Sequence, residues 1–259
     1  MNKVIHISDL ALYKKDVNET IKFFKENKIE NVELFIEPLD GEYTHKMLQV
    51  LDECTFKTLS FHGPYRKCNL AEMTDEAWEN TLISYEKSFE MVKKYKPSFM
   101  VLHTNEWIPS GKITEDLKTE ILKKVDKIVK LGKKYDIDVV VENVGIRRNM
   151  VYSQEEYTEI ILKNNYKCLI DIGHAYANNW DLEKLLSSLK NNILGYHFHN
   201  NDGVNDQHQP ISKGKINYLE IIELIKQNTP NTEIVLEYDY SIDLLEDLVK
   251  DWKKLQKLI

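Results

Sequence analysis

Short apolar runs recur eight times along the chain, and each is followed by a longer amphipathic stretch. The first residues of these runs lie 26 to 41 positions apart, and they are Val4, Val32, Leu59, Met100, Val139, Cys168, Leu194 and Ile234. Compact runs of this kind are typical of parallel strands that are covered on both faces, and each gap has room for a crossover helix. Eight such units in 259 residues predict an α/β fold, a single (β/α)8 TIM barrel that spans residues 1–259 as one domain.

Stretches between the runs carry one apolar stripe, as expected of helices that pack on a sheet. Two stripes with spacings of four, four and three residues are Leu117, Ile121, Val125 and Ile128, and Leu244, Leu248, Trp252 and Leu255. The spacing of a capping box is found in Ser153 with Glu156 and in Asn217 with Glu220. Further N-cap candidates are Thr74, Thr114 and Ser241.

A doubly wound open sheet is the alternative architecture for alternating strands and helices. That fold requires a glycine-rich fingerprint directly after its first strand. The corresponding segment here, from Ser8 to Lys15, contains no glycine, so the barrel is the preferred prediction.

Composition and charge argue against several other classes of protein. No apolar run approaches the ~18 residues of a membrane span, and the N-terminal segment lacks the apolar core of a signal peptide. The three cysteines, Cys54, Cys68 and Cys168, form no C-x-x-C motif, so we expect buried, reduced thiols in a cytoplasmic protein. The net charge is −7 and only three of the 35 basic residues are arginines, which disfavours nucleic acid as a partner but leaves room for a local basic groove.

Imidazole and carboxylate side chains stand at the C-terminal ends of six of the apolar runs. They are His62, His103, Glu142, Asp171, His197, His199 and Glu237, and His174, Asp206 and His208 follow in the adjoining turns and loops. In a barrel these ends share one rim, where barrel enzymes place their chemistry. Each residue alone is more simply explained as a hydrogen-bonded surface group, but the joint pattern predicts a shared site. His6 and Glu37 end the first two runs and could face it, whereas His45 is expected on the surface.

The acidic members of this set, Glu142, Asp171, Asp206 and Glu237, indicate a metal site. Two carboxylates ~5 Å apart repel by about 3 kcal/mol at an effective dielectric constant near 20, and a divalent cation removes that repulsion. Mixed imidazole and carboxylate ligands suit zinc, manganese, cobalt or iron. The alternative is a metal-free hydrogen-bonded network.

Six segments, which carry seven motifs, together resemble the xylose-isomerase-like barrel superfamily, which contains sugar and sugar-phosphate isomerases and epimerases and also endonuclease IV. The segments are HGPYRKCNLAE, LHTN, VENVG, LIDIGHAYA, HFHNNDGVNDQHQPISKGKIN and VLEYD, in this order along nearly the whole chain, the fifth supplying two motifs. By resemblance to the sugar epimerases, one principal metal ion is held by Glu142, Asp171, His199 and Glu237. His199 is preferred to His197 because it precedes the Asn-Asn-Asp step. The arginine that the epimerases carry shortly afterwards is absent from residues 200–205.

The resemblance to the epimerases also implies roles in catalysis. Glu142 and Glu237 would transfer the proton as paired base and acid. The residues expected to hold the substrate are His62, His103, His174, His197, Asp206 and His208.

The same positions also resemble the trinuclear zinc centre of endonuclease IV. The additional metal ligands would then be His62, His103, His174, Asp206 and His208, giving up to three ions, and Tyr65 matches a tyrosine that endonuclease IV places at the DNA. Against this, the loop IEPLDGEY is short and acidic and lacks the DNA-inserting arginine of that enzyme. Candidate DNA contacts would be Arg66, Lys67, Arg147, Arg148, Lys213 and Lys215.

Three functions follow as hypotheses. The preferred one is a metal-dependent isomerase or epimerase of a sugar or sugar phosphate, acting in carbohydrate metabolism on a small-molecule partner. The second is an endonuclease IV-like phosphodiesterase acting on abasic DNA, and the third is a non-catalytic barrel that binds sugar or metal. The sequence gives no indication of the oligomeric state.

Overall fold

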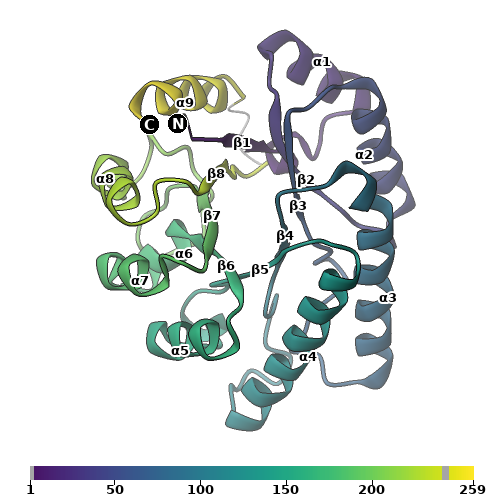
Figure 1. Cartoon of the computed structure of the whole chain (residues 1–259), viewed down its shortest axis with the longest axis vertical. Coiled ribbons are helices and arrows are strands. Elements are labelled where there is room, and N and C mark those ends of the chain that lie inside the picture. Colours follow the sequence, from purple (N-terminus) through teal and green to yellow (C-terminus); the bar gives the residue numbers. More distant parts are fainter. Residues whose placement is uncertain (1–2, 241–244) are drawn as a thin grey trace.

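Eight parallel strands close into a barrel whose order follows the chain (Figure 1). This computed structural model describes residues 3–240 and 245–259. The strands are β1 (Ile5–Ser8), β2 (Asn31–Phe35), β3 (Thr58–His62), β4 (Met100–Leu102), β5 (Val139–Glu142), β6 (Lys167–Asp171), β7 (Ile193–Phe198) and β8 (Glu233–Leu236). The predicted (β/α)8 barrel is confirmed, and β1 pairs with β8 where an open sheet would end.

Helices surround the ring of strands (Figure 1). The α-helices are α1 (Val17–Asn27), α2 (Gly41–Glu53), α3 (Asp75–Val92), α4 (Glu115–Lys134), α5 (Gln154–Asn164), α6 (Ile172–Ala177), α7 (Leu182–Leu189), α8 (Tyr218–Asn228) and α9 (Leu245–Leu258). Shorter 3-10 helices are η1 (Asp9–Leu12), η2 (Lys93–Tyr95) and η3 (Arg147–Asn149).

Helix starts follow the local signals in the sequence. Thr74 and Thr114 cap α3 and α4, and Ser153 with Glu156 forms the predicted reciprocal capping box. Asn217 caps α8 by accepting from the backbone N–H of Leu219. The predicted cap Ser241 and the stripe residue Leu244 lie outside the described residues.

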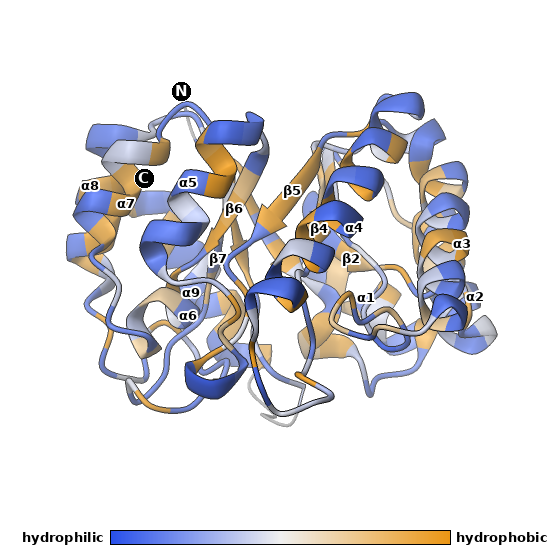
Figure 2. Cartoon of the chain, turned by 90° about the horizontal axis from the view of Figure 1, so that it is seen from below, coloured by the Kyte–Doolittle hydropathy of each residue, from blue (hydrophilic) through white to orange (hydrophobic). Residues whose placement is uncertain are grey.

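Successive strand residues contribute to two separate apolar cores, because side chains alternate across a strand. Outward-facing residues such as Leu34, Met100 and Ile170 pack with the helices in one large cluster. The residues of a second, small cluster face the barrel interior, and they are Phe99, Val101, Val140, Leu169 and Val235. Figure 2 shows the apolar strands enclosed by helices whose outer faces are hydrophilic.

The final inward-facing position on most strands holds a titratable residue instead of an apolar one. The register of neighbouring strands brings these positions to one end of the barrel, and they are His62, His103, Glu142, Asp171, His199 and Glu237. Three of them, His103, His199 and Glu237, lie one residue beyond the end of the assigned strand. The alternation along each strand therefore produces the polar rim that the sequence predicts.

Two expectations from composition can be compared with the structure. Cys68 and Cys168 are buried free thiols as predicted, but Cys54 is only partly buried. In the part of the chain that the structure describes, no helix has the length and apolar character needed to cross a membrane.

Replacing Ile121 by alanine should test the packing of α4 on the barrel. Ile121 is fully buried, so the cavity should lower the free energy of unfolding by about 2–5 kcal/mol. Leu162 on α5 is 50% exposed, and Leu162→Ala should change it by less than about 0.5 kcal/mol. Urea unfolding measures both, and equal losses would contradict the assignment of α4's buried face.

Candidate active site

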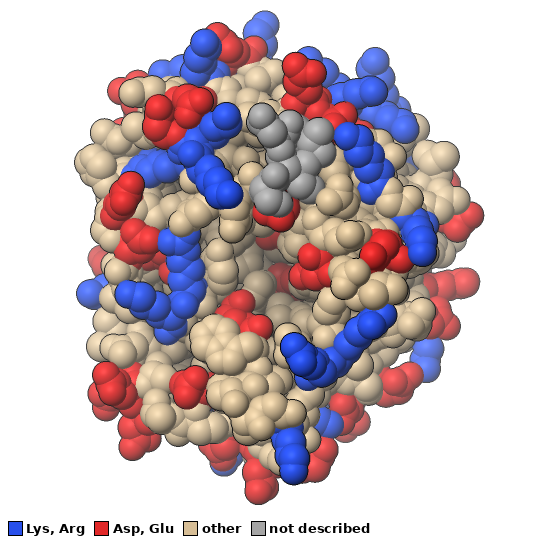
Figure 3. Space-filling model, turned by 180° about the vertical axis from the view of Figure 1, so that it is seen from behind, with Lys and Arg blue, Asp and Glu red and all other residues tan. Residues whose placement is uncertain are grey.

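The rim of the barrel brings together side chains that are far apart in the sequence. On the face seen in Figure 3, acidic side chains gather at a central hollow, with lysine and arginine around them. All ten residues predicted for the site contribute to contiguous groups of possible metal ligands. The first group contains His62, His103 and Glu142, and the central group contains Glu142, Asp171, His197 and Glu237. The outer group contains His174, His199, Asp206 and His208.

The first group consists of His62, His103 and Glu142. The Nε2 atoms of the two imidazoles lie 2.9 Å apart, and Nε2 of His103 is 3.1 Å from Oε2 of Glu142. On the other side of the rings, Nδ1 of His62 is 2.9 Å from the carbonyl oxygen of Gly63, and Nδ1 of His103 is 2.9 Å from Oε1 of Glu106. When Nδ1 donates to these acceptors, the Nε2 lone pairs of the neutral rings face each other, an arrangement that a shared cation stabilises.

The surroundings shift the pKa values of the two imidazoles of this group in opposite directions. Burial and the neighbouring His103 lower the pKa of His62 to about 3. Burial also opposes protonation of His103, but the carboxylates of Glu106 and Glu142 outweigh it and raise the pKa of His103 to about 10. In the metal-free protein, a single proton therefore resides on the His103 side of the pair.

The central group contains three buried carboxylates, those of Glu142, Asp171 and Glu237. Nδ1 of His197 faces them and lies 3.4 Å from Oε2 of Glu142, 3.9 Å from Oδ2 of Asp171 and 3.2 Å from Oε2 of Glu237. Burial opposes ionisation of Glu142 and Glu237, yet neighbouring imidazoles, chiefly His103 for Glu142 and His197 for Glu237, hold both pKa values well below the usual range. The carboxylates of Glu142 and Glu237 therefore stay ionised, and the imidazoles beside them balance their charge in the metal-free protein.

The outer group is organised around the carboxylate of Asp206. Its two oxygens lie 3.1 Å from Nε2 of His174 and 3.2 Å from Nε2 of His208. The ring of His199 stacks on that of His208 with centroids 3.9 Å apart, and Nε2 of His199 is 3.0 Å from Oδ2 of Asp171. Asp171 therefore connects the outer group to the central one.

Hydrogen bonds between side chains and the backbone hold Asp171 in place. The side-chain amide of Asn143 accepts from the Asp171 N–H at 2.7 Å and donates to its carbonyl at 3.0 Å, which extends the β5–β6 pairing by one side chain. The Asp171 carboxylate also accepts from the backbone N–H of His174 at 2.6 Å and caps α6. The role of Asn143 was not predicted, although this residue directly follows Glu142 in the VENVG motif.

Gly173 allows the ring of His199 to approach the start of α6. A Cβ atom at this position would meet three atoms of the imidazole at distances that real side chains do not reach. The glycine in LIDIGHA is therefore required by the close approach of the His199 ring.

Glu37 and His6, which the sequence suggested as further residues facing the site, have other partners. Glu37 accepts from the backbone N–H groups of Tyr65 and Arg66 and orders the loop after β3. His6 is fully buried, and its Nε2 lies 2.8 Å from Oε2 of Glu233, below the rim. His45 is exposed on α2, as expected. Glu106 and Glu33, which contact site imidazoles, were not singled out in the sequence.

The donor atoms of the site fit a divalent metal. The Nδ1 atoms of His174, His197 and His199 are buried without a hydrogen-bond partner, although carboxylate oxygens lie close to the first two. Ligand atoms bound to one tetrahedral ion at about 2.0–2.2 Å lie about 3.3–3.6 Å from each other, close to the separations in all three groups. Imidazole and carboxylate donors together suit zinc, manganese, cobalt or iron.

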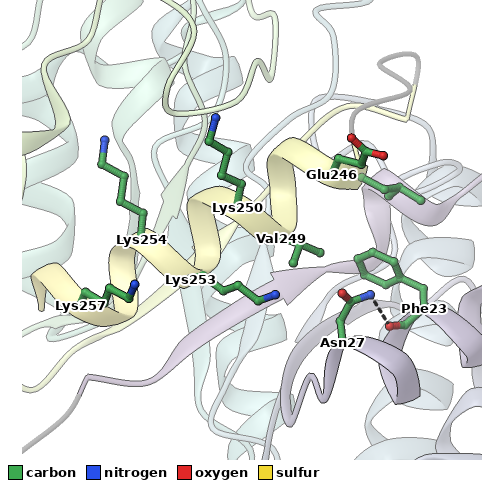
Figure 4. A pocket seen from close by; sticks show the side chains of 9 residues that line it. Phe23, Asn27, Glu246, Val249, Lys250, Lys253, Lys254 and Lys257 are labelled. Carbon is green, nitrogen blue, oxygen red and sulfur yellow. Dashed lines mark hydrogen bonds between the residues drawn. The ribbon is translucent and has the colours of Figure 1, made fainter.

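A groove of about 660 Å³ between α1 and α9 lies apart from this site (Figure 4). Phe23 and Val249 form part of its apolar wall, and its basic residues are Lys250, Lys253, Lys254 and Lys257. None of the rim residues described above lines this groove.

Comparisons with known proteins agree with the fold. The family model of the xylose isomerase-like TIM barrel matches residues 19–258. The uncharacterized protein MJ1311 of Methanocaldococcus jannaschii is 25% identical over 207 residues, covering 76% of this chain and 67% of the relative. The crystal structure of a D-tagatose 3-epimerase-like protein has a TM-score of 0.80 at 20% identity and covers 98% of this chain and 96% of its own. The IOLI protein with a bound zinc atom has a TM-score of 0.76 at 14% identity, with coverages of 98% and 96%.

Gly173→Ala should displace the ring of His199 and lower the free energy of unfolding by about 1–3 kcal/mol, because the added methyl group overpacks the site. Gly41→Ala is the matched control, since a Cβ there meets nothing within 4 Å. Urea unfolding together with the zinc bound per chain measures the effect. Identical behaviour of the two variants would show that His199 does not lie against Gly173.

Proposed function

Because the chain belongs to the xylose isomerase-like TIM barrel family, we propose that it is a divalent-metal-dependent isomerase or epimerase of a sugar or sugar phosphate. The observation that carries the proposal is the pair of buried carboxylates, Glu142 and Glu237, that converge on one atom of His197. The likeness to a D-tagatose 3-epimerase-like protein supports this class of reaction.

The principal ion would be held by Glu142, Asp171, His199 and Glu237. When bound there, a divalent cation supplies polarisation of a substrate carbonyl and stabilisation of negative charge on its oxygen. Glu142 and Glu237 remove and return the proton on the adjacent carbon, and such general acid and base catalysis contributes roughly 10²–10⁴-fold. The remaining imidazoles of the first and outer groups, with Asp206, would bind hydroxyl or phosphate oxygens.

An endonuclease IV-like phosphodiesterase is the second candidate, favoured by the two ligand groups that flank the central one. Two or three ions in such an array would clamp phosphate oxygens. The surrounding surface favours the small substrate instead. Arg66 pairs with Asp40 at 2.6 Å and lies over the ring of Tyr13, and Lys213 pairs with Asp247 at 2.8 Å, so two of the candidate DNA contacts already have partners.

Glu142→Gln should abolish proton exchange at carbon, because the amide cannot accept the proton and ligates metal poorly. His45→Gln, on the exposed surface of α2, should retain it. The measurement is deuterium incorporation from heavy water into a panel of ketohexoses and their phosphates, monitored by NMR with added manganese or zinc. Loss of exchange after chelation and its return with metal are also expected. Equal exchange in both variants would refute the assignment of Glu142.

His208→Ala separates the two candidate functions. For an isomerase with one principal ion, the variant should keep that ion and raise KM by weakening substrate binding. For a phosphodiesterase, His208 is itself a ligand, and the zinc content should fall from three ions per chain to two, with loss of cleavage of an abasic duplex. Elemental analysis and a cleavage assay at increasing salt decide between them, since phosphate contacts weaken steeply with salt.

A further inference from the structure

Below the rim, part of the barrel interior is polar, although such interiors are normally packed with branched apolar side chains. The polar inward-facing residues come from five neighbouring strands, β7, β8, β1, β2 and β3, and they are His197, Glu233, His6, Glu33 and Ser60. The interior apolar cluster lies on the remaining strands together with Val235. Removing ionisable groups from water costs several kcal/mol per ion unless they are paired, so this polar column requires a physical explanation.

Glu33 lies at the centre of the column and has no exposed surface. Its Oε2 accepts a hydrogen bond from the hydroxyl of Ser60 at 3.1 Å, and its Oε1 lies 3.0 Å from Nε2 of His197. Glu33 therefore fixes the orientation of the His197 ring, with Nε2 toward Glu33 and Nδ1 toward the rim.

The other ring nitrogen of His197, Nδ1, faces the rim. Nδ1 of His197 is buried without a hydrogen bond, and it faces the carboxylate oxygens of Glu142, Asp171 and Glu237 at 3.2–3.9 Å. These imidazole and carboxylate atoms converge from different strands, and Glu142, Asp171 and His197 form one group of possible metal ligands. The separations between the atoms are close to those of ligands that share one ion.

We propose that His197, oriented by Glu33, is a further ligand of the central metal ion through its Nδ1 atom. This inference rests on the proposed metal-dependent function and extends its ligand set beyond the four residues named above. A carboxylate that accepts from the second ring nitrogen of a ligating histidine fixes the ring and increases its basicity. His199, whose Nε2 lies near Asp171 and Asp206, would connect the same ion to the outer group.

The test uses zinc and cobalt(II) with purified full-length protein and three variants. His197→Gln restores a polar contact with Glu33 but has no atom at the Nδ1 position, and it should lose central-ion affinity by at least 100-fold. Glu33→Gln should lose about 10–100-fold, as is typical when the partner of a ligating histidine is removed. His6→Gln, in the same column but in contact with Glu233, should bind like the unmodified protein. Competition with a chelator measures the affinities, and thermal unfolding of the metal-free proteins confirms that each is folded.

Proton NMR of the cobalt(II) protein gives a readout that a purely structural role would not change. An Nδ1-bound His197 should give an exchangeable, strongly shifted Nε2–H resonance, absent in His197→Gln, displaced in Glu33→Gln and retained in His6→Gln. If the unmodified protein takes up no ion, the proposed function itself fails. If it binds cobalt and His197→Gln retains both the affinity and every shifted exchangeable resonance, the proposed function stands and the role of His197 is overturned.

Discussion

The site depends on the contacts between the buried carboxylate of Glu142 and the imidazoles around it. It contacts imidazoles from three other parts of the barrel, His103 after β4, His174 in α6 and His197 in β7. A carboxylate buried to this extent is stable only when its charge is compensated, since its desolvation costs several kcal/mol. The first, central and outer groups are therefore one electrostatic unit, and the protonation or metal occupancy of one group affects the others.

The barrel accommodates this charge because one apolar core stabilises the fold while the other, inside the barrel, is small. The large apolar cluster between strands and helices supplies the burial that stabilises the fold. The interior cluster is small, which leaves inward positions available for polar residues such as Glu33 and Ser60. These residues form hydrogen bonds to one another, so the polar interior supports the rim from below.

The same set of ligands suits both proton transfer at carbon and hydrolysis of a phosphate ester. What separates the two chemistries is the surface around the ligands. Arg66 is engaged by Asp40 and aromatic rings, and the chain as a whole carries a charge of −7. A polyanion would approach against that field, whereas a small sugar phosphate presents a single anionic group to the rim.

The sequence alone determined the barrel, because eight apolar runs separated by helix-length gaps have few other solutions. It also placed the titratable residues at the strand ends, since side chains two positions apart face the same side. Their grouping was decided only by the tertiary structure. His197 and His199 both face inward, but two residues along a parallel strand lie about 6.6 Å apart, so His197 faces the central carboxylates while His199 stacks on His208. The partnership of His197 with Glu33, 164 positions away, depends on the closure of the barrel, which leaves only β8 and β1 between β7 and β2, and no local pattern in the chain contains that information.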